Sequence, residues 1–250
     1  MAASTLITLL GPSINPPGSA ALSAMLIRWV HFVAGITWVG LLYFFNLVNV
    51  PFMKEMDSAA KAKIVPSLMP RALWWFRWSA VVTVLAGLAY WGNNIVAVDA
   101  RNGGGSSGRV VGLFFLIWTI AFSLIFFATM IMKINQGPIL GAIVIIVVGV
   151  AAYLFLTFNN HGWESNRLLC IGIGGGIGWI MMLNVWGIIW RINKKIINWT
   201  RDFKNNNTPI PAESAALARI GFLASRTNAW LSLPMLFFMG AASHYPFLGR

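Results

Sequence analysis

The chain has 250 residues, of which 58% are hydrophobic and only 10% are charged, and it contains 13 Trp and 17 Phe. A soluble domain carries roughly 25% charged residues, so this composition excludes a water-soluble globule, a disordered tail and a disulfide scaffold. It predicts an all-α, polytopic membrane protein, because each crossing needs about 20 apolar residues. The single Cys170 excludes an internal disulfide, a c-type haem attachment site and a cysteine-based metal cluster.

Apolar runs predict six membrane-spanning helices within one integral membrane domain, residues 1–250. The predicted spans are residues 20–47, 75–92, 110–132, 138–158, 167–190 and 229–248. A tight turn with Gly137 and Pro138 separates the third span from the fourth.

Three segments between the spans have distinctive compositions. Residues 53–64 and 211–223 are each expected to form an amphipathic helix that lies at the lipid headgroups. The alternative for these two segments is a docking surface for a partner subunit. Residues 102–108, rich in Gly and Ser, are expected to form a flexible loop.

Lys and Arg are distributed unequally between the two sides of the predicted bundle. The loops after spans one, three and five, with Arg77 beside them, carry 13 of the 18 basic residues. The opposite side carries the other 5, namely Arg28, Arg101, Arg109, Arg167 and Arg250. Because basic residues accumulate on the cytoplasmic side, we expect both termini to face the outside of a bacterial inner membrane. In this setting the net charge of +12 does not indicate a nucleic-acid partner.

The chain has 3 His, and all of them are predicted to lie in the outer half of the protein or beyond it. His31 lies well inside the first span, where an imidazole usually faces a partner or a cavity. Gly35, one turn inward, leaves room for a flat group, and Arg28, one turn outward, is placed to meet a carboxylate. This set fits haem b, with His31 on the iron and Arg28 on a propionate. The alternative is a neutral His31 that donates a hydrogen bond to a neighbouring helix.

A second axial ligand would have to come from another helix. His244, near the end of the sixth span and on the same side, is the best candidate. Met is an alternative ligand, although most of the 11 Met are expected to be apolar filling. His161 is expected in the aqueous interface between spans four and five, and a redox or metal role is the less favoured interpretation of it.

Other features of the spans favour packing over chemistry. The small residues from Gly172 to Gly178 recur four apart and indicate close helix packing, with room for a cofactor ring as the alternative. Asn184 is expected to make an interhelical hydrogen bond, and Arg77 to snorkel from an aromatic belt at the interface. None of the 6 acidic residues lies in a predicted span, which disfavours a proton-driven transporter.

Several motifs resemble the membrane part of the cytochrome-linked urate oxidases, the urate oxidase N-terminal domain family. The most specific are SRTNAWLSLPMLF at 225–237 and SHYP at 243–246, and residues 28–40, 75–78 and 184–185 are also similar. Residues 28–40, in the first predicted span, are also similar to the first span of membrane protoporphyrinogen oxidases, which use a His of the first helix for haem. The resemblance implies a helical membrane domain that passes electrons to cytochrome c, with His31 and His244 at positions where the family motif has His.

The chain also departs from the family. Members carry His at the position of Trp74, near Gly172 and often at Thr227, and an acidic residue at the position of Ser79. The 250 residues do not contain the cytochrome c domain that typical members carry after the membrane part. The resemblance therefore implies haem binding more than urate oxidation.

Three functions remain as alternatives. The first is a redox subunit that binds haem b and relays electrons from a partner or the quinone pool to a periplasmic cytochrome c. The second is a non-catalytic structural subunit of a larger membrane complex, and the third is a membrane oxidoreductase acting on urate or a similar small molecule. The small number of polar residues suited to catalysis favours the redox subunit and the structural subunit over the oxidoreductase. The expected partners are the lipid bilayer and either partner subunits or the cytochrome, and the sequence leaves open whether the chain is itself an enzyme.

Overall fold

Long helices account for most of residues 17–249, the part of the chain that the computed structural model describes. In chain order the elements are α2 (Ser19–Tyr43), η1 (Phe44–Asn49), α3 (Val50–Glu55), α4 (Ser58–Trp91), η2 (Gly92–Val96), α5 (Ala97–Gly103), α6 (Ser107–Phe126), η3 (Phe127–Ile131), α7 (Gly137–Phe158), α8 (Asn166–Asn184), η4 (Val185–Ile189), α9 (Trp190–Asn206) and α10 (Ser214–Ala241). The segments η1 to η4 are π-helical and continue the α-helices before them. No strand occurs within residues 17–249, which confirms the predicted all-α fold there.

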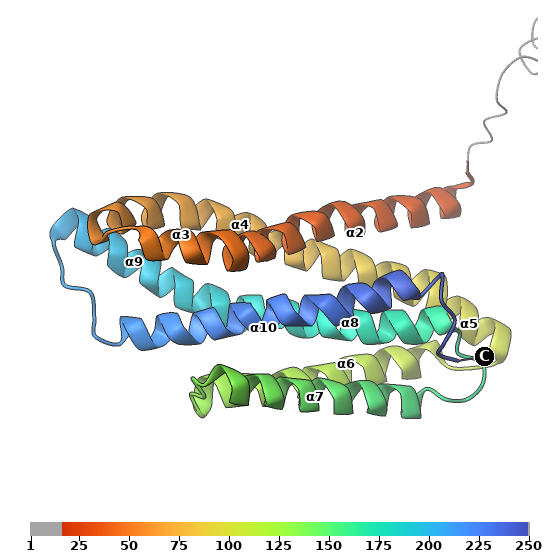
Figure 1. Cartoon of the computed structure of the whole chain (residues 1–250). Helices are drawn as coiled ribbons and strands as arrows, with labels where there is room; N and C mark the ends of the chain where they lie inside the picture. Colours follow the sequence, from red (N-terminus) through yellow and green to blue (C-terminus); the bar gives the residue numbers. More distant parts are fainter. Residues whose placement is uncertain (1–16, 250) are drawn as a thin grey trace, which may run out of the picture.

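Helical runs lie side by side and alternate in direction (Figure 1). Helix α8 is central, because it contacts α4, α6, α7 and α10 and most of its residues are buried. Helix α2 packs mainly on α4, and α7 packs mainly on α6. The start of α2 and the end of the chain lie at the same end of the bundle (Figure 1). This arrangement agrees with an even number of passes.

Five helical runs are long and apolar enough to cross a membrane. They are Ser19–Glu55, Ser58–Gly103, Ser107–Ile131, Gly137–Phe158 and Asn166–Asn206. Helix α10, the sixth predicted span, has 28 residues but includes Arg219 and Arg226 and is not among the five. Helices thus lie at the predicted spans, and five of the helical runs are long and apolar enough to cross a membrane.

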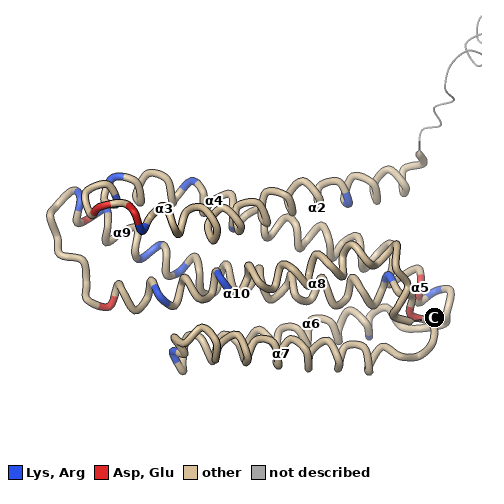
Figure 2. Tube along the Cα trace, in the orientation of Figure 1, with Lys and Arg blue, Asp and Glu red and all other residues tan. Residues whose placement is uncertain are grey.

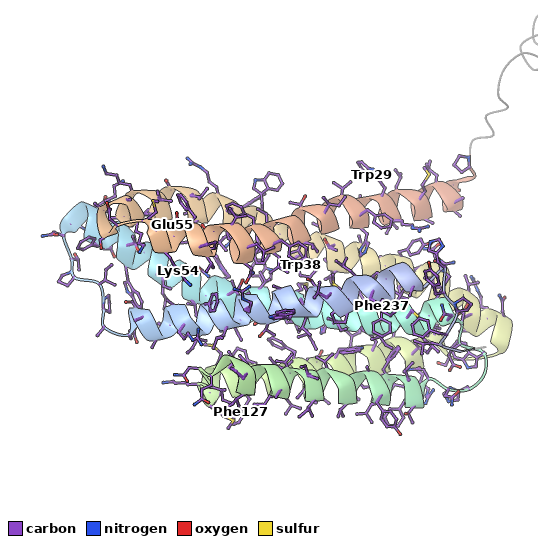
Figure 3. The ribbon with its side chains drawn as sticks, viewed as in Figure 1. Trp29, Trp38, Lys54, Glu55, Phe127 and Phe237 are labelled. Carbon is purple, nitrogen blue, oxygen red and sulfur yellow. The ribbon has the colours of Figure 1, made fainter. Side chains whose placement is uncertain are left out.

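The outer surface of the bundle is rich in large apolar side chains. Ile145 is 74% exposed and Ile36 is 72% exposed. Figure 3 shows the two faces of α2, with Trp29 pointing away from the bundle and Trp38 pointing into it. Exposed apolar area on this scale marks a surface that another apolar phase covers. A lipid bilayer is compatible with this surface, because the helices lie side by side with their axes aligned.

The long helices project beyond α6 and α7 at one end of the bundle (Figure 1). The run Asn166–Asn206 has 41 residues, or about 60 Å at 1.5 Å per residue. The hydrocarbon layer of a bilayer is only about 30 Å thick. Most Lys and Arg lie at this projecting end (Figure 2), so the predicted basic loops are gathered on one side.

The predicted surface helices at 53–64 and 211–223 are not separate elements. Residues 53–55 end α3 and residues 58–64 begin α4, with only Met56 and Asp57 between the two helices. Ser214–Leu223 forms the first part of α10. The helical structure predicted for these segments is confirmed, but they are the ends of longer helices and not separate surface helices, and α4 and α10 both pack against α9 at this end.

Local chemistry explains where the helices begin and end. The Asp57 carboxylate accepts a hydrogen bond from the Ala60 N–H at 2.7 Å, and Ser106 and Ser165 cap α6 and α8 in the same manner. Such caps satisfy N–H groups that have no partner inside the helix. Lys133, with φ of 52°, lies in the predicted turn before α7.

The glycine-rich segment 102–108 is packed rather than free. Gly103 and Gly105 lie so close to the Trp163 side chain that a Cβ at either position would overlap it. Between them, Gly104 has φ of 70° and ends α5, a conformation that glycine adopts without strain. The segment predicted to be a flexible loop instead packs against the Trp163 side chain through Gly103 and Gly105.

The predicted close packing around α8 is confirmed. Gly172 lies against Phe155 and Gly176 lies against Trp118, and both approaches are closer than a Cβ would allow. A Cβ at Gly174 would lie 3.1 Å from the Met235 carbonyl oxygen, so the backbones of α8 and α10 are nearly in contact. Small residues permit such an approach between membrane helices.

The predicted interhelical hydrogen bond of Asn184 is also confirmed. Its Nδ2 donates to Asn228 Oδ1 at 2.8 Å and to the Ala224 carbonyl at 3.0 Å. Asn228 Nδ2 donates in return to the Met181 carbonyl at 3.0 Å. Both side chains are buried, so the pair ties α8 to α10 from both sides.

We expect Gly176→Ala to lower stability by about 1–3 kcal/mol, the usual cost of overpacking a tight core. Trp118 is fully buried and has little room to retreat. The measurement is the thermal unfolding midpoint in detergent solution. Gly112→Ala is the matched control, since a Cβ there meets no atom within 4 Å. Equal midpoints for the two variants would contradict this packing.

Candidate functional site

One cavity lies between α2, α4, α6, α8 and α10. Its volume is about 130 Å³, smaller than the roughly 300–1,000 Å³ of preformed small-molecule and cofactor sites. The lining residues are Arg28, His31, Phe32, Trp38, Thr83, Val84, Gly87, Leu88, Tyr90, Trp91, Phe114, Arg167, Ile171, Gly175, Gly178, Met235, Met239 and Ser243. The lining is mostly apolar, with its charges concentrated in two arginines.

His31 is held in one orientation by helix α4. Its Nδ1 lies 2.7 Å from the Thr83 carbonyl oxygen. Since a carbonyl can only accept, Nδ1 carries the proton, and the neutral ring keeps its lone pair on Nε2. Gly87 is what allows the ring to lie there, because a Cβ at this position would come within 2.8 Å of the imidazole. This fixed tautomer is the arrangement by which a second group orients a metal-binding His.

Two arginines line the same cavity without a carboxylate partner. The Arg167 Nη2 donates to the Tyr90 hydroxyl at 3.2 Å, and its buried Nε has no hydrogen-bond partner in the described structure. The Arg28 guanidinium lies 5.9 Å from the Tyr90 ring centroid. None of the described lining residues is Asp or Glu. The described lining therefore carries two positive charges, the exposed Arg28 and the half-buried Arg167, and no acidic side chain.

The imidazole and the guanidiniums lie at two depths in the bundle. Trp91 Nε1 donates to the Leu168 carbonyl at 3.1 Å and thereby aligns α4 with α8. Tyr90 and Arg167 are neighbours of this pair in sequence, at the outer level. Gly87 and the His31 ring lie about one turn, or about 5 Å, farther into the bundle. The cavity thus presents cations near its mouth and a nitrogen lone pair deeper inside.

The structure brings together two of the four residues that the sequence selected. Arg28 and His31 line the cavity. Gly35 packs against Thr83, since its Cβ would lie 3.5 Å from Thr83 Cγ2. His244 is exposed in the turn after α10 and is not among the described lining residues, although Ser243 is.

Sequence reasoning did not single out Arg167, Tyr90, Gly87, Met235 or Met239 as cavity residues. These residues come from α4, α8 and α10 and meet His31 only through tertiary packing. One signal was present, because Gly175 and Gly178 belong to the small-residue stretch for which room beside a cofactor ring was the alternative. Both line the cavity.

His161 lies in a separate polar cluster in the loop between α7 and α8. Its Nδ1 donates to Glu164 Oε1 at 2.7 Å, and the Arg109 Nη1 donates to its Nε2 at 3.1 Å. Both ring nitrogens are therefore engaged by protein groups. Within residues 17–249 no group of three or more His, Cys, Asp or Glu side chains is placed to hold a metal ion.

The Glu164 carboxylate is buried in this cluster. Burial alone would raise its pKa, but hydrogen bonds from the side chain and the backbone N–H of His161 outweigh burial and hold the pKa below its ordinary value of 4.5. A lowered carboxyl pKa stabilises the fold above the unfolded-state pKa. This contribution is lost as the pH falls through the folded-state pKa.

Comparisons with known proteins agree with this architecture. The family described as Urate oxidase N-terminal matches residues 55–249 of the chain. The match includes α4 to α10 and the residues they contribute to the cavity, whereas Arg28 and His31 lie before it. No curated protein and no solved structure shows significant similarity to the chain.

We expect Glu164→Gln to lower stability by about 1 kcal/mol at pH 7, a value reduced because His161 is partly exposed. The loss of stability on acidification toward pH 4 should also become shallower in the variant, since the titrating carboxyl is gone. Thermal midpoints measured between pH 7 and pH 4 test both effects. The exposed Glu55, replaced as Glu55→Gln, is the control. An identical pH dependence in wild-type and Glu164→Gln protein would show that the cluster does not stabilise the carboxylate.

Proposed function

The chain belongs to the urate oxidase N-terminal family, and from this membership and its cavity we propose an integral membrane redox subunit. In this proposal the cavity binds haem b, and the protein relays electrons to a periplasmic cytochrome c. The observation that carries the proposal is the presence of one oriented imidazole and two arginines, without an acidic residue among the described lining, in a single mostly apolar cavity. Haem b combines an iron that binds imidazole with two propionates and a flat apolar ring.

The cavity residues fit the chemical parts of haem b. His31 Nε2 would bind the iron, because its Nδ1 is already committed to Thr83. Arg28 and Arg167 would each hold a propionate and so remove the uncompensated charge at the cavity mouth. The apolar ring would contact the aromatic and glycine walls, among them Phe114 and Gly175. When bound, the haem iron supplies one-electron transfer, while the protein supplies its ligand, its orientation and its exclusion from water.

We infer six crossings with both termini outside. Five helical runs are long and apolar enough to cross a membrane. Helix α10, which packs along the central α8, would be the sixth crossing. The projecting end, which carries most of the basic residues (Figure 2), would be cytoplasmic by the positive-inside rule. The cavity then lies near the periplasmic surface, in a bacterial inner membrane, where a soluble cytochrome would approach it.

A second function has one observation in its favour. Two guanidiniums in an apolar cavity also suit a small organic anion, and the family name points to urate. The groups missing at Trp74, Ser79 and Thr227 weigh against oxidation of urate by this chain. A structural subunit without any ligand would leave the buried Nε of Arg167 without a hydrogen-bond partner.

We expect the purified full-length protein to show a haem b spectrum, with an α-band on reduction. His31→Ala should lose this pigment because it removes the iron ligand, whereas His161→Ala should retain it. Arg28→Gln and Arg167→Gln should keep most of the haem but lower its midpoint potential, since each removes a positive charge near the iron.

A correctly folded His31→Ala protein with full haem occupancy would overturn the assignment. A colourless wild-type protein whose thermal midpoint rises with urate would replace it with the anion-binding function. A colourless protein without that shift would favour the structural subunit.

The orientation predicts which loops are reachable from the periplasm. In a Cys170→Ala background, Asn160→Cys should react with an impermeant maleimide in intact spheroplasts. Asn206→Cys, at the end of α9, should react only after permeabilisation. Both positions are exposed, so access and not burial decides the labelling. The reverse pattern would invert the topology.

A further inference from the structure

We propose that the surface where α4 passes the start of α9 binds an anionic phospholipid, with the guanidinium of Arg77 on the phosphodiester of the headgroup. The proposal rests on the membrane crossing and orientation inferred above. It is independent of what the cavity around His31 binds, because the two sites lie at different levels of the bundle.

Two tryptophan hydrogen bonds mark these levels. Trp91 Nε1 donates to the Leu168 carbonyl at 3.1 Å, and Trp186 Nε1 donates to the Arg77 carbonyl at 3.3 Å. Arg77 and Trp91 are 14 residues apart on α4, or about 21 Å at 1.5 Å per residue. The hydrocarbon layer is about 30 Å thick, so Arg77 lies toward its other boundary, on the side where most Lys and Arg gather (Figure 2).

The guanidinium of Arg77 is held by two indoles. It lies 3.9 Å from the Trp190 ring centroid and 5.5 Å from that of Trp186. Its Nε is buried against them without a hydrogen-bond partner, and no described residue accepts a hydrogen bond from its two terminal nitrogens, which remain accessible. A guanidinium stacked on an aromatic ring keeps the N–H groups of its plane free, and these match the oxygens of a phosphate.

The charge along both helices near Arg77 is positive. Lys194 is exposed and follows Trp190 by one turn on α9. The next acidic residue on α9 is Asp202, eight residues beyond Lys194, and the nearest one before Arg77 on α4 is Asp57, 20 residues away. These separations are about 12 and 30 Å along the helices. The surroundings favour an anionic headgroup over a zwitterionic one, whose ammonium would meet the same cations.

Exposed apolar side chains continue from Arg77 toward the middle of the bilayer. Trp78 is exposed and packs edge-to-face on Trp186, with 5.2 Å between the ring centroids. Val82 and Leu85 are also exposed and follow Trp78 by four and seven residues on α4, so the three share one face. A cation at the boundary with an apolar stripe beneath it has the polarity of a phospholipid with its headgroup outward.

The apolar stripe distinguishes a lipid from a free phosphate ion. Both ligands would use the N–H groups of Arg77, but only a lipid would also cover Trp78 and Val82. A phospholipid therefore accounts for the stacked guanidinium and for the exposed side chains beside it.

The test measures the thermal unfolding midpoint of the full-length protein, delipidated in a neutral detergent, before and after addition of phosphatidylglycerol. The lipid should raise the midpoint of the wild-type protein, because it binds the folded state. Arg77→Gln should lose most of this rise, and Lys194→Gln should lose part of it. Comparing the rises, and not the starting midpoints, sets aside the stability lost with the Trp190 contact.

Arg71→Gln is the matched control and should keep the full rise. Arg71 is exposed, lies six residues before Arg77 on another face of α4, and donates from Nη1 to the Ser67 carbonyl at 3.3 Å. An equal loss in Arg71→Gln and Arg77→Gln would show a diffuse attraction between charges and would overturn the site.

Two further additions identify the ligand. Phosphatidylethanolamine should raise the wild-type midpoint less than phosphatidylglycerol does, and inorganic phosphate at the same concentration should leave it unchanged. Equal rises with the two lipids would contradict an anionic headgroup, and a rise with inorganic phosphate would replace the lipid by a free anion. No rise in the wild-type protein, or the same rise in Arg77→Gln, would overturn the proposal. None of these outcomes depends on haem, so the proposed function succeeds or fails separately.

Discussion

The close approach of the other helices to α8 is the constraint on which the rest of the bundle depends. Gly172 and Gly176 receive the rings of Phe155 and Trp118 from α7 and α6, and Gly174 nearly touches the backbone of α10. With little hydrophobic driving force between helices in lipid, such packing and buried amide pairs hold a membrane bundle together. The cavity is a result of the same composition, because Gly175 and Gly178 leave its wall bare.

Local spacing made part of this structure predictable. Arg28 and His31 are three residues apart on one helix, so their common face follows from helical geometry alone. The apolar runs placed the predicted spans on helices, except that the sixth extends beyond the end of α10 at Ala241, and they did not locate where α4 and α10 begin. Hydropathy reports where lipid contact ends, whereas Ser58 and Ser214 begin helices that continue into the projecting end. Asn184 was expected to bond another helix, but its partner Asn228 required the tertiary fold.

The remaining differences arise where tertiary contacts overrule composition. Arg77 was expected to snorkel toward water, yet its guanidinium lies 3.9 Å from the Trp190 ring centroid. A cation over an indole face is stabilised without leaving the bundle. In the same way, the glycines of 102–108 suggested flexibility, whereas their lack of side chains is what lets the loop close on Trp163. Arg167 counted only as a charge for orientation, because nothing local connects it to Tyr90 or to His31.

The hydrogen bond from His31 to Thr83 agrees with both interpretations of this residue. A structural His needs it to satisfy Nδ1, and an iron ligand needs it to direct the lone pair of Nε2. What distinguishes the two is the rest of the cavity. A structural imidazole has no need of Arg28 and Arg167 beside it, and the buried Nε of Arg167 has no hydrogen-bond partner in the described structure, which carries a cost. A dianionic ligand that binds only the folded protein would reverse this cost and stabilise the bundle by mass action. Binding of such an anion beside the two arginines would therefore distinguish the proposed site from an imidazole that only packs.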